Sequence, residues 1–332
     1  MQLSEGIELA RYRFSFRITE AMQLPEYAGS ALRGVFGRAL MQLSGLQLRD
    51  IKEKTPLFLH SPYAEIFEPQ ANPQALGILA KLQGTPPLYV VEAPTEGVRF
   101  LDKGENLAFS AVLAGQALTH LPLVILAWRR ALLMGLGRGH AGRAELIRVE
   151  HEQPDGTVAC IYSEDKPLVQ EHVTLLLPPV VKAAADVHLH FLTPLRLQHN
   201  GKVLGTSELT PSLLLRQLVR RMSIYWQMQQ TEAVDVAVIA RLNALADSVT
   251  KDEKRLSFKR WARYSSRQQQ LMQMDGVQGH WLLRNVPVQM QQLLWYGQYL
   301  HVGKGTAFGL GGYVISQQMW QPLIRRNLAD AV

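Results

Sequence analysis

The stretch His301-Val302-Gly303-Lys304-Gly305-Thr306-Ala307-Phe308-Gly309-Leu310-Gly311-Gly312-Tyr313 joins a helical pattern to a strand-like run, Tyr313-Val314-Ile315. It holds five glycines, one lysine and one histidine, and it has no acidic residue. Glycine permits positive φ and close approach of another backbone, and successive amides in such a loop can point at an anion. The order helix, glycine loop, strand therefore decides how this end of the chain folds and what it can bind.

A nucleotide-binding P-loop has the opposite order, because it runs from a strand into a helix and ends in Gly-Lys-Ser/Thr. In this chain Gly303-Lys304-Gly305-Thr306 has the wrong spacing, and a strand follows it. The order argues against a P-loop. Two interpretations stay open, a tight turn without a ligand and a loop that cradles an RNA backbone, and the remaining sequence favours the second.

Composition predicts a folded protein with a polyanionic partner. The chain has 332 residues, of which 47% are hydrophobic and 19% charged, enough for two domains with ordinary cores. Its net charge is +7, and arginine outnumbers lysine, which suits bidentate phosphate contacts. The single cysteine, Cys160, excludes a disulfide within the chain. With no signal peptide and no apolar run long enough for a bilayer, we expect a cytoplasmic protein with no membrane partner.

The first half begins with a half-buried strand, because residues 11–18 alternate strictly between apolar and polar side chains. Its polar side carries Arg11, Arg13 and Arg17, which either solubilise the sheet or face phosphate. A helix is predicted over residues 29–44, where glycines indicate close approach of a packed side chain or of RNA. After it we expect an irregular insertion at 45–86, strands at 88–91 and 106–113, a helix at about 118–134 and a hairpin around Asp155-Gly156.

The second half repeats this plan after a linker near residues 178–185. We expect a strand at 187–192, helices at 211–230 and 233–247, strands at 256–265 and 279–283, a helix at 286–300 and a strand at 313–316. Both halves therefore read strand, helix, strand, strand, helix, strand. The predicted fold class is α+β, with tandem ferredoxin-like (RRM-like) βαββαβ domains at 1–180 and 181–332, the second carrying the glycine loop.

Five blocks of sequence together resemble a known family. They are Leu24-Pro25-Glu26-Tyr27-Ala28-Gly29-Ser30-Ala31-Leu32-Arg33-Gly34 with Phe36-Gly37, Tyr63 with Ile66-Phe67-Glu68-Pro69, Thr193-Pro194-Leu195-Arg196, Arg263-Tyr264-Ser265-Ser266-Arg267-Gln268, and His301-Val302-Gly303-Lys304-Gly305 with Phe308-Gly309-Leu310-Gly311. These blocks resemble the CRISPR-associated endoribonucleases that process precursor CRISPR RNA, within the repeat-associated superfamily of tandem ferredoxin-like domains.

The resemblance implies a reaction. The substrate is a CRISPR repeat RNA, whose own 2′-hydroxyl attacks the adjacent phosphorus and leaves a 2′,3′-cyclic phosphate and a 5′-hydroxyl, with no metal or other cofactor. This chemistry needs in-line positioning, a base for the hydroxyl proton and fixed positive charge beside the phosphate. Histidine suits the base, since its pKa lies near neutrality, and lysine, arginine and backbone amides suit the phosphate.

The catalytic candidates are two histidines and two tyrosines. Many relatives place a histidine soon after the first helix, but residues 26–59 contain none, and His60 is the first. His301 is the alternative and is favoured over His60, although it could instead be a helix-terminal histidine that meets the dipole. Tyr27 and Tyr264 complete the set, because some relatives work without a histidine.

The RNA-binding candidates are four arginines and the glycine-rich stretch. The resemblance and the charge pattern single out Arg33, Arg196, Arg263, Arg267, Gly303, Lys304, Gly305, Phe308, Gly309 and Gly311. For Arg263 and Arg267 a solvated strand end is the competing interpretation. His188 and His190 share one strand face, for which we favour a structural role. No metal site is expected, because the histidines are scattered and the one cysteine has no neighbouring ligand.

Two other functions stay open. The same fold could serve a non-catalytic subunit that holds CRISPR RNA in an effector complex with other subunits. A nucleotide-binding enzyme that uses residues 303–306 is the third hypothesis, and the loop order disfavours it.

Overall fold

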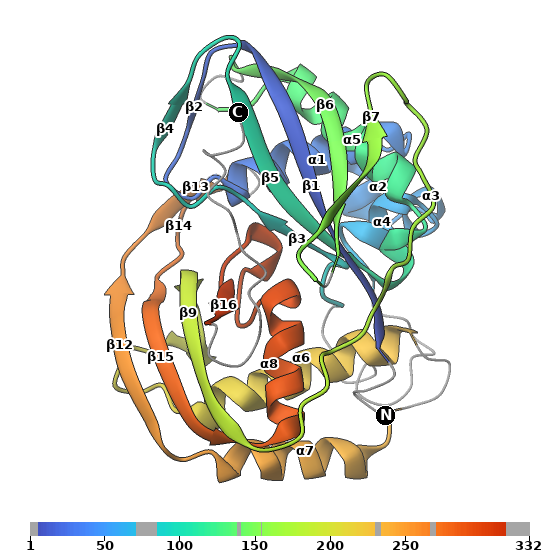
Figure 1. The fold of residues 1–332 in the computed structure, drawn as a ribbon. Helices are drawn as coiled ribbons and strands as arrows, with labels where there is room; N and C mark the ends of the chain where they lie inside the picture. The colour runs from blue at the N-terminus through green and yellow to red at the C-terminus, as the bar shows by residue number, and fades with distance from the viewer. Residues whose placement is uncertain are drawn as a thin grey trace. The chain divides into compact units, whose positions relative to one another are not determined.

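The computed structural model describes residues 6–70, 85–137, 141–153, 155–229, 234–265 and 270–316, with the backbone alone for 263–265 and 270–272. The chain forms two compact units, which meet in sequence between Leu176 and Leu177 (Figure 1). We call them the N-terminal unit and the C-terminal unit. Each has its own antiparallel sheet and its own helices.

The N-terminal unit is a ferredoxin-like sheet with one added edge strand. Its strands lie in the order β3 (Tyr89–Glu92), β5 (Asn106–Ala114), β1 (Ile7–Glu20), β6 (Arg143–Glu152), β7 (Val158–Ser163). The helices are α1 (Gly29–Leu43) and α5 (Leu121–Met134), the latter preceded by the 3-10 turn η3 (Gly115–Leu118). Without β7 the order is second, third, first and fourth strand, as in a βαββαβ unit. Short pairs add β8 (Leu175–Leu176) to β1 and join β2 (Met22–Leu24) to β4 (Arg99–Leu101).

Aromatic side chains of β1 form the core of this unit. Tyr12, Phe14 and Phe16 alternate along the strand and are fully buried. Phe14 lies 6.0 Å from the ring of Trp128 on α5, and Trp128 stacks on Phe36 of α1 with ring centroids 4.5 Å apart. Burying one such side chain stabilises the fold by about 1.5–3 kcal/mol. The period-two pattern therefore turns the aromatic face of β1 toward the helices.

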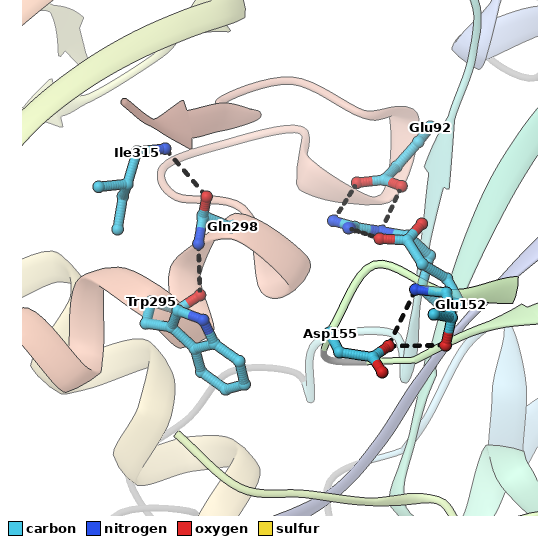
Figure 2. A network of polar contacts seen from close by, with 8 residues as sticks. Glu92, Glu152, Asp155, Trp295, Gln298 and Ile315 are labelled. Atoms are coloured by element: carbon cyan, nitrogen blue, oxygen red, sulfur yellow. Dashed lines mark hydrogen bonds and ion pairs between the residues drawn. The ribbon is translucent and has the colours of Figure 1, made fainter. Parts of the chain in front are cut away.

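The opposite face of β1 buries the charge of Arg11, a residue for which the sequence left two roles open. Arg11 is 4% exposed, and its guanidinium pairs with Glu92 of β3 at 2.9 Å and with Glu152 of β6 at 3.0 Å. Figure 2 shows both carboxylates reaching the same guanidinium. Arg11 is therefore neither a solubilising nor a phosphate-facing residue, because its charge is neutralised within the sheet.

The insertion predicted at 45–86 contains regular structure in its described part. Three short helices occupy it: α2 (Leu48–Glu53), α3 (Pro56–Leu59) and α4 (Pro62–Ile66). The side chains of Thr55 and Ser61 cap α3 and α4, and a proline follows each cap. This pairing is a helix-start signal. The prediction of little regular structure is therefore wrong for 48–66, and 71–84 lie outside the described residues.

The C-terminal unit repeats the same topology. Its sheet has the order β12 (Asp252–Lys259), β15 (Gly276–Val286), β9 (Ala185–Leu195), β16 (Tyr313–Ile315), which again reads second, third, first, fourth. Helices α6 (Pro211–Gln229), α7 (Val236–Ser248) and α8 (Val288–Leu300) belong to it. The predicted tandem ferredoxin-like α+β fold is confirmed.

One strand prediction in this unit is wrong. Residues 256–265 form the end of β12 and a separate strand, β13 (Ala262–Ser265), with Arg260 and Trp261 between them. β13 pairs with β14 (Gln270–Gln273) as a hairpin of its own. A second small hairpin joins β10 (Gln198–His199) to β11 (Lys202–Val203). The apolar alternation in the sequence did not reveal the break between β12 and β13. Where a strand leaves its sheet depends on which strands it pairs with.

Two glycines of α1 predict opposite effects of the same substitution. A Cβ at Gly37 would lie 2.3 Å from Cζ of the buried Phe67 ring, whereas a Cβ at Gly34 would meet nothing within 4 Å. We expect Gly37→Ala to lower the free energy of unfolding by roughly 1–3 kcal/mol through overpacking. Gly34→Ala should raise it by about 0.5–1 kcal/mol, because alanine favours helix. Urea unfolding of both variants checks this, and equal effects would contradict the packing described.

The buried His151 predicts a pH-dependent stability. It lies on β6, 7% exposed, with its ring centroid 4.7 Å from that of His172, whose Nε2 lies 2.8 Å from the Tyr12 hydroxyl. Burial, and secondarily the charge of His172, lower the pKa of His151 to about 4. An unfolded histidine has a pKa of about 6.5.

Between these two pKa values the unfolded chain binds a proton at His151 that the folded chain does not. Stability should therefore fall as the pH drops from about 6.5 to about 4, by up to roughly 3 kcal/mol. The variant His151→Phe should lose less stability than wild type across this window, while His199→Ala, an exposed control, should follow wild type. Identical pH profiles for wild type and His151→Phe in chemical unfolding would refute the assignment.

Candidate nucleic-acid interface

The glycine-rich loop follows α8 and lies along the end of β9. The Gly311 amide donates to the Pro194 carbonyl at 2.9 Å, and the Lys304 amide donates to the Arg196 carbonyl at 2.9 Å. The Thr193 hydroxyl donates to the Gly309 carbonyl at 2.7 Å and accepts from the Gly312 amide at 2.8 Å. The loop is thereby fixed to the strand by backbone and threonine contacts. Two of the predicted RNA-binding blocks, Thr193-Pro194-Leu195-Arg196 and the glycine loop, are brought together.

Glycine is required in this loop by contact with the chain itself. Gly303 has φ 93° and Gly311 has φ 68°, both in the left-handed region. A Cβ at Gly303 would lie 2.6 Å from the Arg196 carbonyl oxygen, and a Cβ at Gly311 would lie 1.8 Å from the Val302 carbonyl oxygen. Any larger residue at these two positions would therefore push the loop off β9.

Most loop amides are engaged within the protein. Donors to protein acceptors are the amides of Val302, Lys304, Phe308, Gly309, Leu310, Gly311 and Gly312. The expectation that successive amides point at an anion is therefore wrong for these seven groups. The cation that the loop offers to solvent is the exposed Lys304 side chain.

Arg196 lies next to Lys304, because its backbone pairs with that of Gly303 and accepts the Lys304 amide. Its Nη1 donates to the Gln273 carbonyl at 2.7 Å, and its side chain is half-buried. Its buried Nε has no hydrogen-bond partner among the described residues. The guanidinium is thus held in place while part of its donor capacity is unused.

His301 is enclosed by the loop that it begins. Its side chain is 1% exposed, and its Nδ1 lies 3.2 Å from the Leu310 carbonyl oxygen. A Cβ at Gly312 would lie 2.6 Å from the His301 Cε1 atom. The residue also has φ 58°, a backbone conformation that costs a non-glycine residue roughly 1–3 kcal/mol. The ring therefore braces the loop from inside, away from the surface.

The other candidates lie in the N-terminal unit, in the loop itself, or where side chains are not described. His60 ends α3 and is exposed. Tyr27 precedes α1 and is half-buried, and burial, with the charge of Glu26 second, raises its pKa. Arg33 lies over the Phe67 ring, with its Cζ 4.2 Å from the ring centroid. Phe308 is half-buried in the loop, Arg263 and Tyr264 lie on β13, and Arg267 lies outside the described residues.

One histidine of the N-terminal unit has a carboxylate partner that no sequence pattern predicted. The His120 Nε2, at the start of α5, lies 2.6 Å from Oε2 of Glu65 on α4. Both side chains are partly exposed, at 26% and 42%. A histidine oriented by a carboxylate is a common arrangement for a general base. Fifty-five residues separate the two, and no local pattern links them.

Two absences apply to the part of the chain that the structure describes. No group of three histidine, cysteine, aspartate or glutamate side chains is arranged to hold a metal ion. No described helix is long and apolar enough to cross a membrane.

Family models match both units. A model described as CRISPR-associated endoribonuclease Cas6 matches residues 189–313, which include the glycine loop, and a model described as an N-terminal domain matches residues 7–174. No curated protein sequence matches the chain.

Solved structures share the fold at low sequence identity. A Cas6 product complex is 17% identical, with 93% of this chain and 100% of that chain covered and a TM-score of 0.51. Thermus thermophilus Cas6 is 16% identical, with 93% and 99% covered and a TM-score of 0.50. A partial complex of Cas6-RT-Cas1 with Cas2 is 12% identical, with 96% of this chain and 48% of that chain covered and a TM-score of 0.53.

These matches define an RNA-processing protein built from two ferredoxin-like units. Over residues 189–313 the chain matches the Cas6 family of CRISPR-associated endoribonucleases, and the solved Cas6 structures share its fold across both units. The resemblance seen in the five sequence blocks is thereby confirmed.

The exposed Lys304 predicts a salt-dependent contribution to RNA binding. Lys304→Ala should weaken binding of a repeat RNA about three- to tenfold and reduce the salt slope of log Kd by about 1, since one phosphate contact is lost. Lys182→Ala is the matched control, because Lys182 is also an exposed lysine of the C-terminal unit, away from the loop. Fluorescence anisotropy at several salt concentrations measures both. An unchanged slope for Lys304→Ala would remove this residue from the interface.

Proposed function

We propose that the protein cleaves CRISPR repeat RNA by attack of the 2′-hydroxyl on the adjacent phosphorus, without a metal ion. The products are a 2′,3′-cyclic phosphate and a 5′-hydroxyl. The supporting observation is the loop of the Cas6-matched region, which holds its exposed Lys304 on a backbone fixed to Arg196. A preorganised cation needs little reorganisation when it meets a phosphate of the RNA.

For the general base we propose His60 in place of His301. The His301 ring is 1% exposed, so a ribose hydroxyl cannot reach it in this conformation. His60 is exposed and has no polar partner among the described residues, which leaves both ring nitrogens available. The preference for His301 drawn from the sequence is therefore reversed, and His301 becomes a positioning residue for the loop.

The tyrosines fit a different role. The raised pKa of Tyr27 keeps its phenol protonated near neutral pH, so this group suits hydrogen-bond donation better than proton abstraction. Tyr264 remains a candidate on sequence grounds alone, because the structure places its backbone in β13 and does not describe its side chain. His120 is the competitor of His60, because Glu65 orients its ring and the side chain is partly exposed.

Single-turnover cleavage of the cognate repeat RNA in EDTA tests the reaction. We expect cleavage with wild type, none when the scissile nucleotide carries a 2′-deoxy sugar, and a cyclic phosphate end on the product. A base variant should lose about 100-fold or more in rate at saturating enzyme, with RNA affinity unchanged. His60→Ala should show this loss, and His120→Ala should not.

The outcomes separate the alternatives. If His120→Ala shows the loss and His60→Ala does not, the oriented histidine is the base. His301→Ala should lower both affinity and rate, and lose thermal stability, because the loop loses its brace. Tight binding with no cleavage by wild type in EDTA would select the non-catalytic CRISPR RNA-binding subunit of an effector complex. Cleavage that needs an added divalent metal would refute the metal-independent route.

A further inference from the structure

The outer face of the C-terminal sheet carries three histidines on its two central strands. Along β9 the buried Leu189 and Phe191 alternate with His188 and His190. On β15 the exposed His280 pairs directly with His190 in the sheet register. Helices α6 and α8 lie on the other side of this sheet (Figure 1). The three imidazoles therefore occupy the face that the helices of this unit leave uncovered.

The three rings form one cluster, in which the His188 ring is tilted by 34° against that of His280. His190 and His280 are stacked, with ring centroids 4.0 Å apart and an interplanar angle of 15°. His188 lies 5.2 Å from His280, and its Nδ1 is 2.8 Å from the Ser316 hydroxyl oxygen. Among the described residues no set of three potential metal ligands is found, here or elsewhere. Burial, then the charge of His280, lower the pKa of His188 and of His190, which favours neutral rings.

The edge strand beside the cluster supplies positive charge. Arg255 of β12 pairs with His280 in register, and Lys259 lies four residues further along the same face. Both are exposed. Two acidic residues of this face, Glu253 and Asp186, both form ion pairs with Arg284. The histidine cluster is therefore bordered by cations that have no acidic partner among the described residues.

Aromatic rings beside cations on an exposed sheet face are suited to binding single-stranded RNA. Four-stranded sheets of RNA-recognition domains bind unpaired bases by stacking them on aromatic residues of the two central strands. Histidine is one of the side chains that stack on bases, and stacking tolerates different sequences because every base has a π-face. Double-stranded RNA offers no free base faces to such a surface.

We propose that His188, His190 and His280 form a platform that stacks bases of a single-stranded RNA segment, with Arg255 and Lys259 beside its phosphates. This inference rests on the proposed function and extends it: the platform holds an unpaired part of the substrate, whereas the glycine loop contacts a backbone phosphate of the RNA. No residue of the platform belongs to the proposed cleavage site.

Fluorescence anisotropy with an unstructured ten-nucleotide RNA and with a blunt duplex RNA tests the platform. The double variant His190→Ala/His280→Ala should bind the single strand about tenfold more weakly and the duplex as wild type does. The double variant His190→Phe/His280→Phe should keep single-strand affinity, because its rings still stack. His199→Ala, which removes an exposed histidine of the same unit on β10, should bind like wild type.

A crosslinking measurement needs no variant. Wild-type protein irradiated with the same RNA containing 5-bromouridine should give crosslinked peptides that include residues 188–190 or 280, mapped by mass spectrometry. Crosslinks only elsewhere, unchanged affinity in the alanine variant, or equal losses in the alanine and phenylalanine variants would overturn the platform. A folding failure of the alanine variant leaves the phenylalanine and crosslinking results to decide.

Cleavage separates this inference from the proposed function. The alanine variant should cut a hairpin repeat without single-stranded flanks at the wild-type rate at saturating enzyme. If wild type cuts no RNA in EDTA yet the platform variants lose single-strand binding, the cleavage proposal fails and the platform stands. If cleavage is normal and single-strand binding is unaffected, the platform fails alone.

Discussion

The central strand β9 is the constraint on which the C-terminal unit depends. It pairs with β15 on one side and β16 on the other, and its end carries the backbone carbonyls that hold the glycine loop. A shift of one residue in this register would exchange the buried Leu189 and Phe191 with the histidines between them. It would also move the Arg196 carbonyl away from the Lys304 amide. The core, the loop and the outer histidine cluster are therefore fixed together by one pairing pattern.

The glycine loop is built by contacts within the protein, and its role toward RNA stays a prediction. Glycine is needed at Gly303 and Gly311 because both positions touch carbonyl groups of the protein. The loop is held by its own hydrogen bonds and by the buried His301 ring. What this construction achieves is rigidity: an exposed lysine on a fixed backbone needs little reorganisation when it meets a phosphate.

The two units share strand order and differ in what their outer sheet faces carry. In the N-terminal unit that face buries the ion pairs of Arg11 with two glutamates. These pairs link neighbouring strands of the sheet. In the C-terminal unit the corresponding face carries stacked imidazoles beside exposed cations. The fold is thus the same twice, and the chemistry of the outer face differs, because outward side chains are free to vary while the inward ones are constrained by packing.

The sequence by itself determined the repeated strand and helix order of the two units, since alternation along β1 and β9 and the helical spacings are local properties of the chain. It also located the glycine loop beside Lys304. Only the tertiary structure decided that His301 is buried, that Arg11 is neutralised, and that Glu65 meets His120 while His190 meets His280. The pairings of Arg11, His120 and His190 join residues 55 to 141 positions apart. Burial and pairing follow from how elements pack, and no local pattern encodes that.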